Sequence, residues 1–179
     1  MNQTRAARVL REWDAKGRYV FTRGVLAKLF SEDSAKTFTE GLGRLVKAGT
    51  LVRACRGVYV NPHARSFDSR VIERIALALR PGEYNYVSLE SAMSEYGAIS
   101  QIPIDRVTVM TTGRKGIYET PYGVIEFTHT RRPVADILEH IHRVEGRPLR
   151  VASKAAAWRD LKRVGRNTAL VDLESVADE

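Results

Sequence analysis

Cysteine is nearly absent from this 179-residue sequence: Cys55 is the only one, so no disulfide can form within the chain. Long hydrophobic runs are absent as well, and no apolar stretch approaches the ~18 residues that a membrane-spanning helix needs. The first residues also lack the apolar core of a secretory signal. These absences argue against a disulfide-rich secreted domain and against a membrane protein, and they predict a cytoplasmic protein.

Metal-binding patterns are missing too. The four histidines are His63, His129, His140 and His142, and no two of them have the HxxxH spacing. His140 and His142 stand two residues apart on a predicted helix, where their side chains would point away from each other. Because there is also no second cysteine, we expect no zinc site and no other bound metal.

Motifs that mark enzymes are absent as well. The segment 113–116, GRKG, is too short for a phosphate-binding loop and predicts a turn, and the segment 88–91, SLES, lacks the flanking glycines of a nucleophile elbow. Three glutamates near Arg74 could form a nuclease-like carboxylate cluster, but each lies on a predicted helix whose solvated face explains it more simply: Glu73, Glu90 and Glu95. We therefore expect no catalytic residues, no cofactor and no enzymatic activity.

The net charge of the chain is confined to its first 67 residues. This segment has 13 Lys and Arg against 5 Asp and Glu, a surplus of +8, whereas the remaining residues have 16 of each sign. A basic excess of this kind in one small segment is typical of a module that binds nucleic acid. The charge therefore predicts double-stranded DNA as the partner of the first segment.

The first sixty residues have the pattern of three helices and a hairpin. Apolar residues recur at helical spacing in the segments 4–16, 23–30 and 34–48, and Thr22 is a suitable N-cap for the second helix. The segment 51–60 has two short strand-like runs around Gly57. This order predicts a winged helix-turn-helix domain over residues 1–63.

The second half of the chain mixes helical and strand patterns. Helices are predicted over residues 69–79, 88–96, 133–144 and 154–164, with Ser88 and Ser153 as N-caps. Strands are predicted over residues 84–87, 106–111 and 123–128. These elements predict a mixed α/β domain over residues 68–179, and a chain of the α+β class.

The third predicted helix and the hairpin carry the candidate DNA contacts. With Phe38, Leu42 and Leu45 facing the core, the ~100° step per residue turns the basic and polar side chains outward. Two arginines lie on or near the tip of the hairpin, the wing, where they can reach an adjacent groove or phosphate. The predicted DNA-binding residues are Ser34, Lys36, Thr37, Arg44, Lys47, Arg53 and Arg56.

A second basic concentration lies near the end of the chain. The segment 143–166 has eight Lys and Arg against two acidic residues. Such a patch could contact flanking DNA, bind an acidic partner protein, or be solvated without a partner. Its predicted members are Arg143, Arg147, Arg150, Lys154, Arg159, Lys162 and Arg163.

The order of these motifs resembles a known family. The segment 19–59, which ends in the LVRACRGVY wing, resembles the N-terminal winged helix of AbiEi antitoxins. The segment 86–92, YVSLESA, then Gly97, the segment around Pro103 and the Tyr122–Gly123 pair are similar to the start of that family's second domain. The likeness extends from about Arg8 to Arg132.

The resemblance implies an antitoxin of a type IV toxin–antitoxin system, a class tied to abortive infection and phage defence. Such a protein represses its own operon by binding inverted repeats of the promoter through its winged helix. Its second domain counters a nucleotidyltransferase-like toxin, and the two proteins need not form a complex. Positive surface residues of the second domain are implicated in this family, which fits the 143–166 segment.

Two other functions stay open on the sequence. One is a plain winged-helix transcriptional regulator whose C-terminal domain binds a ligand or dimerises. The other is a nucleic-acid enzyme such as a nuclease, which would need metal-dependent turnover.

Overall fold

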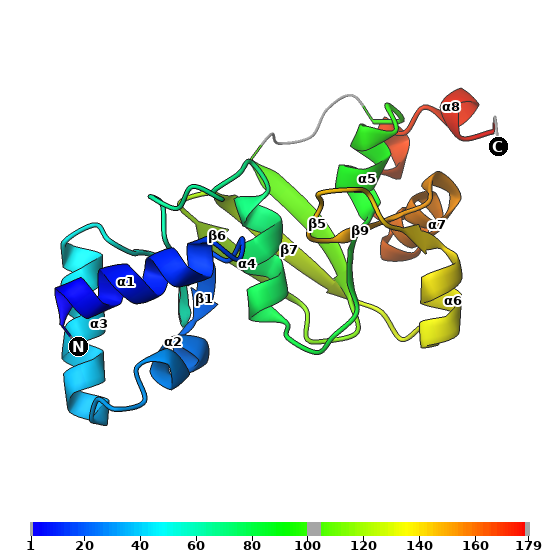
Figure 1. Ribbon diagram of the computed structural model, residues 1–179. Helices are drawn as coiled ribbons and strands as arrows, with labels where there is room; N and C mark the ends of the chain where they lie inside the picture. Colours follow the sequence, from blue (N-terminus) through cyan, green and yellow to red (C-terminus); the bar gives the residue numbers. More distant parts are fainter. Residues whose placement is uncertain (1, 100–104, 178–179) are drawn as a thin grey trace. The chain divides into compact units, whose positions relative to one another are not determined.

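The computed structural model describes residues 2–99 and 105–177. The chain forms two compact units, Met1–Val71 and Ile72–Glu179, and has the predicted α+β architecture (Figure 1). The segment around Pro103 lies outside the described residues. None of the helices in the described part of the chain is both long and apolar enough to cross a membrane.

The first unit has the element order of a winged helix. Three helices are followed by a hairpin, and a short strand lies between the first two helices. In chain order the elements are α1 (Gln3–Asp14), β1 (Val20–Thr22), α2 (Arg23–Leu29), α3 (Ala35–Lys47), β2 (Val52–Cys55) and β3 (Val58–Val60).

Local signals set the limits of α2 and α3. The side chain of Thr22 accepts a hydrogen bond from the backbone N–H of Val25 at 3.1 Å, and Ser34 accepts one from Thr37 at 3.2 Å. Both are N-caps that satisfy helix donors with no partner in the helix. After α3, Gly49 adopts a left-handed conformation with φ of 72°. The predicted starts of both helices are therefore confirmed to within a residue.

Strand β1 was not predicted from the sequence. It pairs antiparallel with β3, with Val20 opposite Val60, and gives a three-stranded sheet in the order β1-β3-β2. Three residues are too few to display a strand periodicity, and their pairing partner, β3, lies about forty residues away in the chain. The sheet closes one side of a single core: Ala6, Leu10, Phe21, Leu26, Phe30, Phe38, Leu42, Leu45, Leu51 and Tyr59.

The first unit extends beyond the predicted boundary at residue 63. The carboxylate of Asp14 accepts hydrogen bonds from the backbone N–H groups of Arg65 and Ser66, at 2.8 and 2.9 Å. The Ser66 hydroxyl donates to the same carboxylate at 2.6 Å, and this bond is the main reason that the pKa of Asp14 lies below its ordinary value. Tyr19 also donates to Asp68 at 2.7 Å. The segment expected to begin a linker is thus held to α1 by contacts that no local pattern reveals.

The described residues of the second unit form eleven elements after α4, which begins at the border of the unit. In chain order they are α4 (Val71–Leu79), β4 (Asn85–Val87), α5 (Leu89–Glu95), β5 (Arg106–Thr111), β6 (Gly116–Thr120), β7 (Gly123–His129), α6 (Val134–Glu139), β8 (Ile141–His142), β9 (Arg150–Ala152), α7 (Lys154–Val164), the 3-10 turn η1 (Thr168–Leu170) and α8 (Leu173–Ala177).

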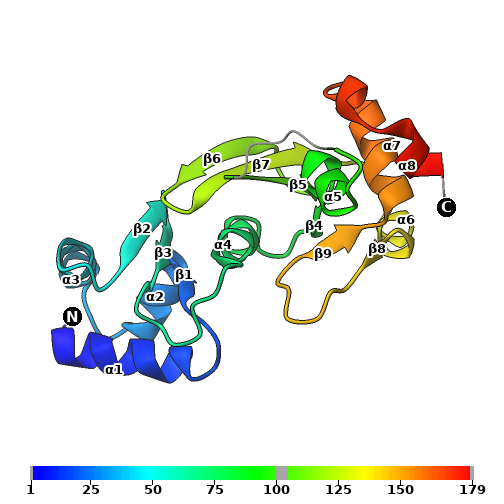
Figure 2. The same cartoon turned by 90° about the horizontal axis from the view of Figure 1, so that it is seen from above.

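The described strands of this unit form one mixed sheet in the order β6-β7-β5-β4-β9-β8. Strand β5 pairs parallel with β7, while β6 returns antiparallel along the outer side of β7 (Figure 2). Strands β5 and β4 are antiparallel, and β4 and β9 are parallel. Parallel pairs require crossover connections, and here a helix or an extra strand lies within each crossover.

Alternating side chains of the sheet contact different helices. The Arg80 guanidinium, just after α4, lies 4.5 Å from the centroid of the Phe127 ring on β7. On β5, the Thr108 hydroxyl accepts from the backbone N–H of Ser91 on α5 at 3.0 Å. Thr108 pairs with Glu126, the neighbour of Phe127, so these two contacts lie on opposite faces. The α4 and α5 helices therefore cover different faces of the sheet.

Several local predictions for this unit are wrong. The helix predicted over 133–144 ends at Glu139, because Ile141 joins the sheet opposite Ala152. Strands β6, β8 and β9 were not predicted. Strands β8 and β9 have only two and three residues, too few to show a strand pattern. Ser88 makes no side-chain cap, because its hydroxyl donates instead to Asp160 at 2.9 Å. Ser153, in contrast, caps α7 as predicted.

Two glycines give a matched test of backbone conformation in this unit. Gly123 has φ of 120°, and an added Cβ would collide with the carbonyl oxygen of Asp105 and lie 3.0 Å from Ile72. Gly165 has φ of 72° and no atom within 4 Å of an added Cβ. We expect Gly123→Ala to lower the free energy of unfolding by about 3 kcal/mol and Gly165→Ala by about 1 kcal/mol. Guanidinium denaturation measures the free energy of unfolding of each variant. Equal losses in the two variants would contradict the prediction.

Candidate nucleic-acid interface

The outer face of α3 is polar and basic, as the periodicity predicts. Phe38, Leu42 and Leu45 are buried, which turns the intervening positions to solvent. The hydroxyl of Ser34 lies 2.9 Å from that of Thr37, so the first turn of α3 presents two coupled hydroxyls. The structure exposes the residues predicted on this helix: Ser34, Lys36, Thr37, Arg44 and Lys47.

The wing is a short hairpin that turns at Arg56 and Gly57. Gly57 has φ of 82°, which a tight turn favours in glycine. Its carbonyl oxygen accepts from the backbone N–H of Arg23 at 2.8 Å, so the turn is tied to the start of α2. Arg53 and Arg56 are both exposed. The wing therefore holds two basic side chains at a fixed place in the first unit.

Cys55, between these arginines in the chain, is half-buried. Burial raises the pKa of its thiol, with a smaller opposing effect from the Arg53 charge. The thiol is therefore protonated at neutral pH and acts as a small packing group.

Arg23 is a basic residue of this surface that the sequence reasoning missed. It is exposed at the first turn of α2, and its guanidinium donates to the Thr39 hydroxyl at 2.9 Å. It also lies 5.3 Å from the centroid of the Phe38 ring. A cation in the first turn of a helix interacts unfavourably with the helix dipole. The position of Arg23 at the start of α2 was therefore the one sequence signal that its side chain makes another contact. That contact joins α2 to the outer face of α3.

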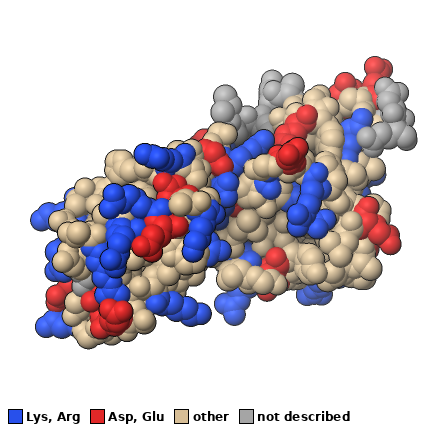
Figure 3. All heavy atoms as spheres, in the orientation of Figure 1, with Lys and Arg blue, Asp and Glu red and all other residues tan. Residues whose placement is uncertain are grey.

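The charge of the chain follows the division into units. Residues 1–71 have 14 Lys and Arg against 6 Asp and Glu, and residues 72–179 have 15 of each sign. Figure 3 shows Lys and Arg side chains distributed over the surface of the molecule in one view. The first unit thus carries the net charge of +8 together with the exposed face of α3 and the wing, an arrangement that suits a polyanion.

In the structure, fewer residues form the basic patch of the second unit than the sequence predicts. The side chain of Arg147 is 3% exposed, as is that of Glu73, and the two are paired at 2.8 Å. A second pair joins Arg147 to Glu95 at 2.6 Å. Burial alone would lower the pKa of Arg147, but the hydrogen bonds that it donates to Glu95 and Glu73 raise it above its ordinary value. Arg147 is therefore an internal ion-pair residue, and its assignment to a surface patch is wrong.

The other members of the patch lie on several elements. Lys154 donates to the carbonyl oxygen of Ser175 at 2.8 Å, and Arg159 lies 3.8 Å from Asp136. Arg150 is half-buried on β9, and Arg143 is exposed after β8. Lys162 and Arg163 are exposed on α7, one turn from Arg159. The remaining basic patch is one side of α7, formed by Arg159, Lys162 and Arg163.

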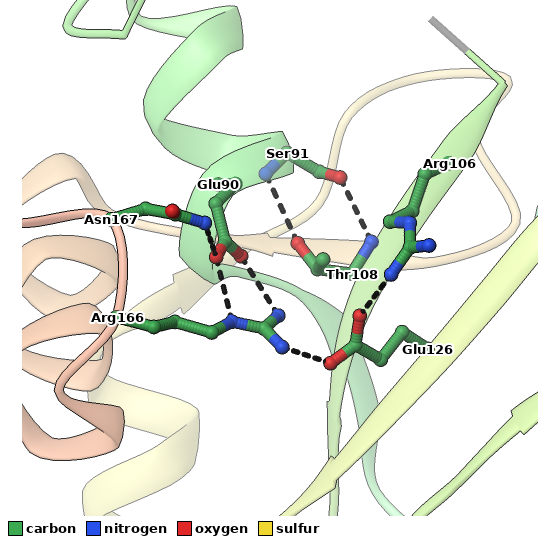
Figure 4. Close-up of a pocket in the computed structure, with 7 residues that line it drawn as sticks. All are labelled: Glu90, Ser91, Arg106, Thr108, Glu126, Arg166 and Asn167. Atoms are coloured by element: carbon green, nitrogen blue, oxygen red, sulfur yellow. Dashed lines mark hydrogen bonds and ion pairs between the residues drawn. The ribbon is translucent and has the colours of Figure 1, made fainter. Parts of the chain in front are cut away.

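A cluster of charges also lines a hollow of about 140 Å³ in the second unit (Figure 4). Arg166, after α7, bridges two carboxylates: its Nε lies 2.7 Å from Glu90 Oε1, and its Nη1 is hydrogen-bonded to Glu126. Glu126 is also paired with Arg106 at 2.7 Å. The four residues form one chain of ion pairs that joins α5, β5, β7 and the segment after α7.

This cluster is electrically balanced. Burial alone would raise the pKa of Glu126, but hydrogen bonds from Arg166 and Arg106 outweigh it and hold the pKa below its ordinary value. Glu73 and Glu90, which were expected on solvated helix faces, are 2% and 3% exposed, so that expectation is wrong. Each is neutralised by an arginine more than seventy residues away in the chain, which sequence spacing cannot reveal. Within residues 2–99 and 105–177, no three His, Cys, Asp or Glu side chains are placed to hold a metal ion.

Backbone strain accompanies the cluster. Leu89, directly before Glu90, has φ of 57°, a left-handed conformation that costs a residue other than glycine about 1–3 kcal/mol. The strain is held by neighbours on both sides: the Ser88 carbonyl accepts from Thr108 at 2.6 Å, and Glu90 is bound by Arg166. The segment before α5 is thus fixed by the sheet and by the segment after α7.

Comparison with known proteins finds a family model that matches most of the first unit. Residues 8–62 match a family model described as a transcriptional regulator, AbiEi antitoxin. Most of the first unit is thus similar to an AbiEi-type regulator domain. The match runs from α1 through the wing, so the AbiEi-type domain includes every predicted DNA-binding residue. The resemblance drawn from the segment 19–59 is confirmed.

A solved structure extends the fold comparison to the second unit. The crystal structure of the RV2827C protein from Mycobacterium tuberculosis matches with a TM-score of 0.59 and 16% sequence identity. The match covers 98% of this chain and 71% of that chain. At this identity the likeness concerns the fold alone. No curated protein matches the sequence.

Proposed function

We propose that this chain is an antitoxin that binds double-stranded DNA at inverted repeats of its own promoter and represses its operon. The observation that carries the proposal is the basic outer face of α3, exposed together with Arg53 and Arg56 of the wing in an AbiEi-type regulator domain. Exposed Lys and Arg would contact phosphates, and the paired hydroxyls at the start of α3 would lie near base edges.

The second half of the proposal concerns the second unit. There the chain would counter a nucleotidyltransferase-like toxin in the cytoplasm, without forming an obligatory complex with it. The description of the matched family as an antitoxin supports this role. The basic side of α7, with Arg159, Lys162 and Arg163, is the part of the predicted patch available for such a role or for flanking DNA. The chain itself would catalyse no reaction.

The alternative is a plain transcriptional regulator whose second unit binds a ligand. The hollow of Figure 4 favours it, because Arg106 and Arg166 are both about one-third exposed there. Each has guanidinium N–H groups beyond those its carboxylate partners use, so an acceptor-rich ligand would find donors.

Co-expression separates the two functions. Cells would express the toxin encoded beside this chain together with the full chain, either unchanged or with Arg44, Arg53 and Arg56 replaced by alanine. We expect the triple variant to lose repression of a promoter–reporter fusion and to keep protecting the cells, because protection would reside in the second unit. A Lys162→Glu/Arg163→Glu variant would test the basic side of α7 in the same assay. Failure of the unchanged chain to protect would favour the plain regulator.

A further inference from the structure

Strand β6 is an open edge of the sheet in the second unit. It occupies the end of the order β6-β7-β5-β4-β9-β8, and no strand of the described residues pairs with its outer side. Figure 2 shows it beyond β7, as the outermost strand at that end. Ile117, the second residue of the strand, is 62% exposed, although it is a large apolar side chain. Open edges of this kind are ready templates for another strand.

The backbone of β6 presents its outward hydrogen-bonding groups at alternate residues. Glu119 pairs with Val124 of β7, and the N–H of Val124 points the other way, to the carbonyl oxygen of Asp105 at 2.7 Å. The Glu119–Val124 pair is therefore a non-hydrogen-bonded pair of the antiparallel ladder, and the same holds for Ile117 and Glu126 two residues along. The N–H and C=O groups of Ile117 and Glu119 consequently point away from β7.

The side chains of this edge are complementary to themselves. An antiparallel copy centred on Ile117 would place the two Ile117 residues opposite each other and Lys115 opposite Glu119 of the second copy. In the same register Tyr118 would lie opposite Gly116, a pairing in which an aromatic ring covers the glycine of an edge strand. Of the opposed positions, 117 and 119 have backbone groups that point outward, and Lys115 directly precedes the strand at the same alternation.

Neighbouring registers fit less well. Centring the pair on Tyr118 would oppose Ile117 with Glu119 and Lys115 with Pro121, which has no N–H to donate. Centring it on Gly116 would oppose Lys115 with Ile117. The charges favour the register centred on Ile117, since Lys115 and Glu119 are both exposed and form no ion pair with the residues described.

We infer that two copies of this chain associate through antiparallel pairing of their β6 strands, with the two-fold axis at Ile117. The pairing would join two six-stranded sheets into one. It is argued from the second unit alone and is independent of DNA binding, although a two-fold pair suits inverted repeats. The contact area of one strand is small, so the dimer is expected to be weak and concentration-dependent.

Charge exchange tests the register. Lys115→Glu and Glu119→Lys each place like charges opposite each other twice in the dimer, and each is expected to weaken association about tenfold in sedimentation velocity. The double variant Lys115→Glu/Glu119→Lys restores both ion pairs and is expected to associate as the unchanged chain does. Lys162→Glu, on α7, is the control for a change of net charge alone. A chain that stays monomeric at every concentration overturns the inference, as does a double variant no better than the single ones.

Disulfide cross-linking locates the two-fold axis of the proposed dimer. Opposed residues in hydrogen-bonded pairs have Cα atoms about 5.5 Å apart, within the range of a disulfide. In a Cys55→Ser background, Ile117→Cys is expected to form a covalent dimer on mild oxidation. Glu119→Cys in the same background is the matched control, because the two copies of residue 119 would lie four residues out of register. Equal cross-linking of both variants would contradict the pairing.

Discussion

Replacing Arg44, Arg53 and Arg56 with alanine is expected to weaken binding of the chain to its promoter DNA by about 10²–10³-fold at constant salt. The three side chains are exposed on α3 and the wing, and each is expected to contribute about 1–1.5 kcal/mol through a phosphate or base contact. None of the three belongs to the core of the first unit, so the variant is expected to fold normally. Fluorescence anisotropy with a labelled promoter fragment measures the change.

The matched control removes the same charge from another face. Arg8 and Arg11 are exposed on α1, and Arg18 lies over the ring of Trp13 at 5.2 Å from its centroid. Replacing these three by alanine lowers the net charge equally but leaves α3 and the wing intact. We expect at most a few-fold loss of affinity, from the weaker long-range attraction. Equal losses in the two variants would show that charge alone, and not the α3 surface, determines binding.

Arg147→Ala is expected to lower the free energy of unfolding of the second unit by about 3–5 kcal/mol. The variant would leave the buried carboxylate of Glu73 with the backbone N–H of Leu149 at 3.3 Å but without the Arg147 guanidinium, which lies 2.8 Å from it in the unchanged chain. Breaking one side of a buried ion pair costs more than the pair contributes, because the remaining charge is uncompensated. Arg147→Ala/Glu73→Leu, which removes both charges, is therefore expected to recover part of the loss.

The two tryptophans allow this to be measured for one unit. Trp13 lies in the first unit and Trp158 on α7 of the second, so a Trp13→Phe background makes the fluorescence report the second unit. Arg143→Ala is the control, since Arg143 is exposed in the same segment of chain, and its effect is expected to stay within about 0.5 kcal/mol. Similar denaturation midpoints for Arg143→Ala and Arg147→Ala would refute the internal role of Arg147.

The first unit was largely predictable because its signals are local. The caps at Thr22 and Ser34 and the spacing of Phe38, Leu42 and Leu45 fix α2 and α3 within a few residues of sequence. The same spacing gave the exposed face of α3. Of its fold, β1 and the segment bound to Asp14 were missed, and both depend on partners about forty to fifty residues away.

The second unit was less predictable because its strand pairings and ion pairs join residues that are far apart in the sequence. Residues 141–142 continue a helical pattern, yet they form β8 because β9 offers an edge to them. Arg147 and Arg166 belong by composition to a basic surface segment, but Glu73 and Glu90 bind them across more than seventy residues. Charge patterning along a chain shows how many charges a segment has, and only tertiary structure shows which of them are already neutralised.

The salt dependence of promoter binding tests the central claim most directly. If α3 and the wing neutralise about six to eight phosphates, the logarithm of the association constant should fall against the logarithm of the salt concentration with a slope of roughly −5 to −7. The Arg44→Ala/Arg53→Ala/Arg56→Ala variant should show a slope less steep by about 2–3, whereas the Arg8/Arg11/Arg18 variant keeps the original slope. Identical slopes for the unchanged chain and the α3–wing variant would contradict the account.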